Sequence, residues 1–233
     1  MLMNLKTCFL IFTLTLFFNT CFAQISLQDL NSLHNAASYT GSKNELIEVF
    51  SKNVRYPKAA FSAKKISTII GVLKISRSGD IIETGALNKA DEVFVNEFNR
   101  VAKTTKGKWK VTNDSAEHFY AVIPIQFNLH EAGYDLSTEK MPSFFQDVVV
   151  ITAVGASGAF QQLYEKKEGA LAMKVNELVQ KEAYTEAIIP MTELFNLQPF
   201  HTGYYEPLIS LLNKAGKSTD YEYYLRLKNM LRN

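Results

Sequence analysis

A strict alternation of side chains between residues 119 and 129 constrains the fold more than any other feature of the chain. Every second residue is apolar, and these residues are Phe119, Ala121, Ile123, Ile125, Phe127 and Leu129. A period of two places them on one face of a β-strand, which predicts a long strand with a buried face. Pro124 lies on the opposite face and has no N–H to donate, so we expect an edge strand or a bulge.

A β-hairpin is predicted before this strand. Residues 67–76 and 81–84 are rich in β-branched side chains, which favour a pleated backbone. Residues 77–80 between them contain Gly79, which can adopt the positive φ that a tight turn needs. The two segments are therefore expected to pair as antiparallel strands.

Two amphipathic helices complete this unit. Residues 43–53 form the first, which must end before Pro57, and residues 89–103 form the second, with Asn88 as the expected N-cap. Apolar side chains fall at helical spacing in both, at Leu46, Ile47 and Phe50 in the first and at Phe94, Phe98 and Val101 in the second. The element order predicts an α+β fold, a small antiparallel sheet with helices on one face.

An ordered set of residues runs through residues 46–129. It opens with an aromatic residue, Lys-Asn, an apolar residue, Tyr-Pro and an alanine, which are Phe50, Lys52, Asn53, Val54, Tyr56, Pro57 and Ala60. It continues with Gly79 in the hairpin and Trp109 after the second helix, and it ends with Pro124-Ile125-Gln126-Phe127. With this order, residues 43–129 resemble the C-terminal domain of the TonB family. The resemblance implies that Trp109 is buried beside the second helix.

Two positions depart from the family pattern. Ser67 stands where the family commonly has the glycine that opens the first strand, and Val111 stands where a proline usually follows the tryptophan. No proline-rich spacer follows the amino-terminal segment. The resemblance implies a non-catalytic periplasmic protein-interaction module associated with outer-membrane transport. The alternative is a cell-envelope scaffold or adaptor without a transport role.

Such a sheet can bind a partner by strand addition, in which main-chain hydrogen bonds extend the sheet. If residues 119–129 form the edge, their outward side chains meet the partner, and these are Tyr120, Val122, Gln126 and Asn128. Proline at Gln126 should then block binding without unfolding the domain. The expected partners are envelope proteins, among them an outer-membrane receptor peptide, and a homodimer is a further alternative. Equally, the edge could be covered by the C-terminal half of the chain.

The amino terminus has the pattern of a signal peptide at residues 1–23. A short basic start is followed by an uncharged apolar run, and Cys21-Phe22-Ala23 offers small residues where a signal peptidase cuts. The apolar run is short for a membrane span, which needs roughly 20 residues. We therefore expect cleavage after Ala23 and a periplasmic protein, with polar residues 24–42 leading into the fold. The alternative is an uncleaved anchor in the inner membrane.

Several function classes are disfavoured by the composition. The two cysteines, Cys8 and Cys21, both lie in the predicted leader, so the mature chain has no thiol chemistry and no disulfide. Without the leader, 24 basic residues face 23 acidic ones, and this balance argues against nucleic-acid binding. Because no nucleophile–base pair and no metal-ligand spacing is visible, we expect no enzyme activity, no cofactor and no metal site.

The C-terminal part of the chain is predicted to be a separate helical region. Residues 130–142 have the composition of a linker, and residues 143–233 follow as an α-helical hairpin domain. Residue pairs 34 apart share their character, namely Leu178 with Leu212, Ala187 with Tyr221, and Met191 with Leu225. This period and residues 184–199 resemble a tetratricopeptide repeat, with Gly216 in the next turn. Pro190 falls within a predicted helix, and a plain helical extension is the alternative.

Residues 147–153 stand out because five consecutive side chains, from Val148 to Thr152, are β-branched. The segment is similar to the extended peptide that outer-membrane receptors present to TonB. It could pair with the edge of the chain's own sheet or imitate a receptor peptide. Alternatively, it is a buried strand or the first helix of the C-terminal region.

Overall fold

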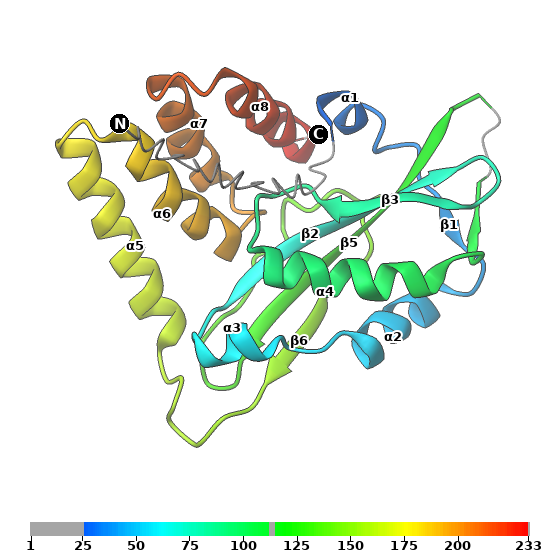
Figure 1. Ribbon diagram of the computed structural model, residues 1–233, viewed down its shortest axis with the longest axis horizontal. Coiled ribbons are helices and arrows are strands. Elements are labelled where there is room, and N and C mark those ends of the chain that lie inside the picture. Colours follow the sequence, from blue (N-terminus) through cyan, green and yellow to red (C-terminus); the bar gives the residue numbers. More distant parts are fainter. Residues whose placement is uncertain (1–25, 112–114, 233) are drawn as a thin grey trace, which may run out of the picture.

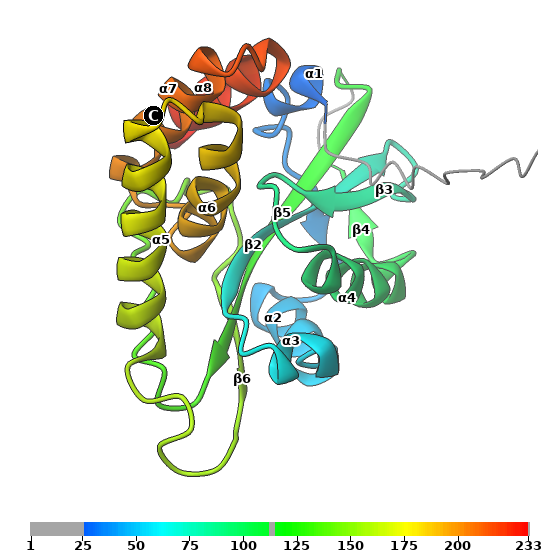
Figure 2. The same cartoon turned by 60° about the vertical axis from the view of Figure 1, so that its left-hand side comes forward.

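The computed structural model describes residues 26–111 and 115–232, and the predicted leader lies outside them. The described residues form three layers, with a β-sheet between two groups of helices (Figures 1 and 2). The general prediction of an α+β fold is confirmed. The prediction that helices cover only one face is wrong, because the central strands carry buried side chains on both faces.

The sheet has the strand order β3-β2-β5-β6. Its strands span Ser67–Ser76 (β2), Ile81–Ala86 (β3), His118–Leu129 (β5) and Val149–Ala153 (β6). The first three are antiparallel and lie close to their predicted bounds, and Gly79 turns the hairpin with a φ of 83°. Strand β6 is parallel to β5, so the sheet is mixed and not purely antiparallel. A short ribbon of β1 (Ser38–Tyr39) and β4 (Trp109–Lys110) lies apart from it.

One face of the sheet packs against the two helices that were predicted from the sequence and against a short third helix that was not. These are α2 (Lys43–Asn53), the short α3 (Lys58–Ser62) and α4 (Glu92–Ala102), which continues into the 3₁₀ turn η1 (Lys103–Thr105). The rings of Phe94 and Phe127 stack in this core with their centroids 4.4 Å apart. Trp109 is 5% exposed, and its Nε1 donates to Thr105 Oγ1 at 3.0 Å. The predicted burial of Trp109 is confirmed.

The opposite face packs against the C-terminal helices. Their bounds are Leu163–Gln180 (α5), Tyr184–Leu197 (α6), Tyr205–Lys214 (α7) and Ser218–Arg232 (α8), with a 3₁₀ turn η2 at Thr202–Tyr204. The short helix α1 (Leu27–Leu30) contacts α8. Pro190 lies inside α6, and the helix continues through it. Within the described residues, no helix combines the length and apolar character needed to cross a membrane.

The predicted 34-residue period is visible in two helix–turn–helix pairs. The turn at residues 181–183 joins α5 to α6, and the turn at residues 215–217 joins α7 to α8. The central residues of both turns, Glu182 and Gly216, have positive φ values of 55° and 68°. Equivalent 2.9 Å hydrogen bonds close the turns, from Ala183 N to Leu178 O and from Lys217 N to Leu212 O. The spacing reflects two similar local structures.

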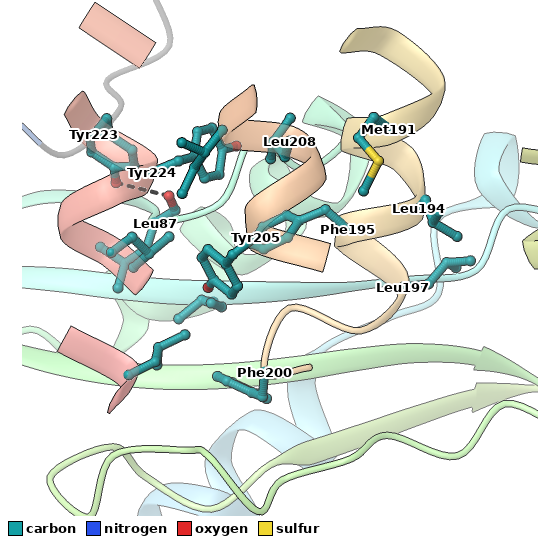
Figure 3. Close-up of a cluster of buried hydrophobic side chains, with 14 of the residues drawn as sticks. Leu87, Met191, Leu194, Phe195, Leu197, Phe200, Tyr205, Leu208, Tyr223 and Tyr224 are labelled. Atoms are coloured by element: carbon teal, nitrogen blue, oxygen red, sulfur yellow. Dashed lines mark hydrogen bonds between the residues drawn. The ribbon is translucent and has the colours of Figure 1, made fainter. Parts of the chain in front are cut away.

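Buried polar contacts join the helical layer to the sheet. Asn88, predicted as the cap of α4, lies in this contact instead, and Asp91 caps the helix through Val93 N. The side chain of Asn88 accepts from Ile70 N at 2.7 Å and donates to Asn196 of α6 at 2.8 Å. From α8, the hydroxyl of Tyr223 donates to the carbonyl of Leu87 at 2.8 Å (Figure 3). The loop after β3 is therefore held by two helices.

The predicted boundary between two domains does not match the packing. Residues 130–142, expected as a linker, include Tyr134, whose ring is buried and whose hydroxyl lies 2.6 Å from Thr68 Oγ1 of β2. That hydroxyl also donates to the carbonyl of Leu197 at the end of α6. Strand β6 belongs to the sheet although it lies in the region expected to be helical. One continuous apolar core includes side chains from β2, β5 and the C-terminal helices.

Candidate protein-interaction edge

Strand β5 was predicted to form the edge of the sheet, and this prediction is wrong. On the side away from β2, its backbone at Tyr120 bonds to residues 35–37, with Tyr120 N donating to Asn35 O at 2.8 Å. Farther along, Gln146 N donates to Val122 O at 2.8 Å, and β6 then pairs with residues 125–129. The chain's own later segments therefore cover this side of β5.

The four side chains expected to meet a partner face the interior of the protein. Tyr120, Val122 and Gln126 are buried, and Asn128 is partly buried, because the C-terminal helices cover that face of the sheet. The side-chain amides of Gln126 and Asn128 both donate to the carbonyl of Tyr134, at 3.0 and 3.3 Å. These four residues hold the two layers together and are not presented to solvent.

Pro124 nevertheless lies where the pairing on the outer side of β5 is irregular. It lies opposite Ile70, whose own N–H and C=O bond to Asn88 and Leu87 on the far side of β2. The backbone nitrogen of Pro124, which carries no hydrogen, therefore faces away from β2. It lies between the Gln146 contact and the start of β6. The proline thus lies where the neighbouring segment has not yet begun regular pairing.

The outermost strand on this side is β6. Its residues alternate strictly, since Val149 and Ile151 are buried against α2 and its neighbours, whereas Val150 and Thr152 are exposed. The exposed fraction of Val150 is 52%, which is unusual for a large apolar side chain. The segment is a strand because its β-branched side chains favour a pleated backbone and half of them fill the core. Of the alternatives from the sequence, pairing with the chain's own sheet is the one observed.

The backbone of β6 has one paired side and one unpaired side. His130 N donates to the carbonyl of Ala153, so Ala153 directs its polar groups toward β5. Because N–H and C=O groups alternate along a strand, Val149 and Ile151 do the same, and Val150 and Thr152 direct theirs outward. In the described part of the chain, no strand pairs with this outer side. It is an open edge that can accept another strand.

Side-chain contacts attach the start of β6 to the rest of the fold. Asp147, just before β6, pairs with Lys43 at the start of α2, with an Nζ–Oδ1 distance of 2.9 Å. Phe145 is buried, and its ring contacts Phe200 with centroids 6.3 Å apart. These contacts and the buried face of β6 make its displacement from β5 costly. A partner would therefore add to the outer side of β6 and would not replace it.

The outer side of β6 has few of the features that prevent edge strands from pairing with other chains. Natural edge strands commonly carry charged residues or bulges that discourage pairing with other chains. No charged residue occurs from residue 148 to residue 164. The opposite edge of the sheet, β3, differs, because it carries Glu83 and its pairing with β2 is irregular after Lys74. We therefore identify the outer side of β6, with Val150 and Thr152, as the candidate interaction edge.

A buried ion pair lies at the far end of β5. The Oδ1 atom of Asp29 is 2.8 Å from Lys74 Nζ, and it accepts a hydrogen bond from the hydroxyl of Tyr120. Burial alone would raise the pKa of Asp29, but hydrogen bonds from Lys74, Ser26 and Tyr120 hold it at about 2. Burial, together with the same contact to Asp29, raises the pKa of Tyr120 above its ordinary range. The cluster ties residues 26–35 to the sheet.

An open cleft of about 790 Å³ lies between α1, residues 139–144 and the C-terminal part of α8. Leu33 and Leu231 contribute buried apolar walls, and Lys140 and Arg226 lie at its exposed rim. Its lining contains a single carboxylate, that of Glu139, and therefore offers no carboxylate pair. Across residues 26–111 and 115–232, no group of three or more His, Cys, Asp or Glu side chains could hold a metal ion.

Comparisons with protein-family models, with curated proteins and with solved structures found no match to this chain. The candidate edge therefore rests on the chain's own geometry. The edge predicted from the sequence was β5, whereas the outermost strand is β6, and Val150 and Thr152 were not among the predicted residues. The signal that could have found them was the β-branched run at residues 147–153, with its alternation and its lack of charge.

Proposed function

We propose that this chain is a non-catalytic protein-interaction module that pairs the outer edge of β6 with an extended segment of a partner. The supporting observation is the arrangement of Val150 and Thr152, whose side chains are exposed and whose backbone groups are directed away from β5. Main-chain hydrogen bonds would supply affinity, and Val150 would contribute an apolar contact. Because β6 is already paired with β5 and packed against the core, less entropy is lost when the partner binds.

The setting we propose is the periplasm of a bacterial cell envelope. The signal-peptide pattern at residues 1–23 supports export, and the resemblance of residues 43–129 to the TonB C-terminal domain supports an envelope protein as partner. The buried Trp109, the Gly79 turn and the strand that contains Pro124-Ile125-Gln126-Phe127 agree with that resemblance. An energy-transducing role in outer-membrane transport follows from the resemblance alone.

A scaffold or adaptor without a transport role is the second candidate. It is favoured by the strand β6, which occupies the edge of β5 that a transducer of this kind would offer to a receptor peptide. The C-terminal helices also cover the sheet face that carries Tyr120 and Val122. On this account, the partner binds at β6 and no force needs to pass from the inner membrane.

Site-specific photo-crosslinking in living cells tests the proposed function. A photoreactive amino acid replaces Val150 or, as a matched control, Ile82 on β3, which is 53% exposed. The Val150 position should give adducts with another envelope protein, identified by mass spectrometry, whereas the Ile82 position should not. Adducts at Ile82 alone would move the interaction to the opposite edge. Adducts at neither position would contradict binding by strand addition.

A further inference from the structure

We propose that a second copy of this chain pairs with the β6 edge, in an antiparallel arrangement about a two-fold axis. The inference uses the edge that the proposed function uses, and it names one specific occupant. Two sheets with the order β3-β2-β5-β6 would then join through their β6 strands into one continuous sheet. A two-fold axis brings identical surfaces together, so each strand is both template and partner.

The pattern of β6 suits pairing with itself. The outward backbone groups belong to Val150 and Thr152, and both copies present the same set. Antiparallel pairing can place Val150 opposite Val150 or opposite Thr152 of the partner, and in either register outward groups meet outward groups. β-Branched side chains opposite one another on the exposed face stabilise such a pair.

The distribution of charge favours the antiparallel arrangement of two copies. Residues 148–164 carry no charge, so no like charges oppose each other along the strand. The nearest charged residue, Asp147, is paired with Lys43 of its own chain. In the antiparallel registers above, Asp147 lies opposite Ala153 or Gly155 of the second copy. In a parallel arrangement, the two Asp147 side chains would be neighbours and would repel.

Exposed apolar surface also indicates a partner of this kind. Val150 is 52% exposed, and Val154, immediately after the strand, is 71% exposed. Antiparallel pairing would place Val154 of each chain opposite Val148 of the other when Val150 faces Thr152, and diagonally next to Val148 when Val150 faces Val150. Both ends of the paired strands would therefore gain apolar contacts, in addition to the main-chain hydrogen bonds at the centre.

Analytical ultracentrifugation of the chain purified after export tests the inference. The wild-type protein should sediment as a dimer that dissociates on dilution. The double variant Val150→Lys/Thr152→Lys should raise the dimer dissociation constant at least about tenfold, because four lysines would then face each other across the axis. The matched control Ile82→Lys, on the opposite edge, should leave the constant unchanged. Circular dichroism confirms that each variant is folded.

Cysteine cross-linking then tests the strand arrangement. Because Cys8 and Cys21 both lie in the predicted leader, cysteines introduced at residues 150 and 152 supply the only thiols after cleavage. The double variant Val150→Cys/Thr152→Cys covers both registers, since paired strands bring Cα atoms within disulfide range. Mild oxidation should give covalent dimers of this variant and not of Ile82→Cys.

The outcomes separate this inference from the proposed function. A wild-type protein that stays monomeric, or a Val150→Lys/Thr152→Lys variant that dimerises as well as the wild type, overturns the second-copy inference. If cross-links from Val150 to a different envelope protein persist in that case, the proposed function stands. A dimer that depends on Val150, without cross-links to any other protein, supports the inference and contradicts the proposed binding of an envelope partner.

Discussion

The side-chain amide of Asn88 lies 2.8 Å from that of Asn196, across the contact between the sheet and the C-terminal helices. Asn88 also donates to Thr68 O and accepts from Ile70 N, and Asn196 donates to Lys89 O. Because both side chains are buried, these bonds cannot be exchanged for bonds to water. The pair therefore makes the stability of the two layers interdependent.

Replacing Asn88 with alanine should destabilise the whole molecule. The change leaves buried groups at Ile70 and Asn196 without a partner, which should lower the free energy of unfolding by about 2–4 kcal/mol. Urea unfolding followed by circular dichroism measures this loss. We expect a single transition that shifts as a unit. The exposed Asn44 of α2 provides the control, since Asn44→Ala should change stability by no more than about 0.5 kcal/mol.

Trp109 supports the core on the α4 side. Its ring packs edge-on against Tyr39, with centroids 5.5 Å apart, and its Nε1 donates to Thr105. Trp109→Ala should cost about 3–5 kcal/mol, and Trp109→Phe should cost less because it keeps most of the packing. The measurement is the thermal midpoint of each variant. Equal midpoints for the alanine variant and the wild type would place the indole outside the core.

The ion pair of Asp29 and Lys74 predicts a specific acid dependence. Asp29 has a pKa of about 2 in the folded protein, below the ordinary value of 3.8 that applies to the unfolded chain. Its contribution to stability is therefore complete above pH 3.8, and it is lost as the pH falls from 3.8 through 2. Asp29→Asn should be less stable than the wild type at neutral pH, and the difference should shrink across that window. Urea unfolding at a series of pH values measures it.

Proline substitutions distinguish the inner strand from the outer one. The N–H of Gln126 is directed toward β6, and its side chain bonds to Tyr134, so Gln126→Pro should lower stability by about 3 kcal/mol or more. If β5 were an edge strand, Gln126→Pro would instead leave the domain folded. The N–H of Val150 is directed outward, so Val150→Pro should cost about 1 kcal/mol or less. Urea unfolding of the two variants checks the contrast, and equal costs would contradict the assignment of the edge.

The local elements could be predicted from the sequence because short-range rules determine them. The helix at residues 43–53 and the strand at residues 67–76 have the predicted bounds, and Gly79 forms the predicted turn. Alternation correctly placed Phe119, Ala121, Ile123, Ile125 and Phe127 on one buried face of β5, whereas Leu129 joins the core on the other side. The opposite face escaped prediction because Gln126 and Asn128 are polar, yet both are satisfied by the carbonyl of Tyr134. Such hydrogen bonds depend on the tertiary structure, so the local sequence does not reveal them.

The long-range arrangement could not be predicted for the same physical reason. The parallel pairing of β6 with β5 depends on the path of residues 130–148, in which Gln146 and the buried Phe145 fix the approach. Composition alone makes that stretch resemble a linker. Asn88 was a plausible helix cap by its type, but its partners Ile70 and Asn196 lie far from it in sequence. The candidate edge depends on both of these long-range arrangements.

Amide hydrogen exchange at β6 tests the central claim most directly, because it reports main-chain pairing residue by residue. The amides of Val150 and Thr152 should exchange rapidly in dilute protein and become protected when a second copy or a partner adds to the edge. Those of Val149 and Ile151, which already face β5, should be protected throughout. Protection at Ile82 on β3 instead, or unchanged exchange at Val150 and Thr152 in the associated protein, would contradict the account.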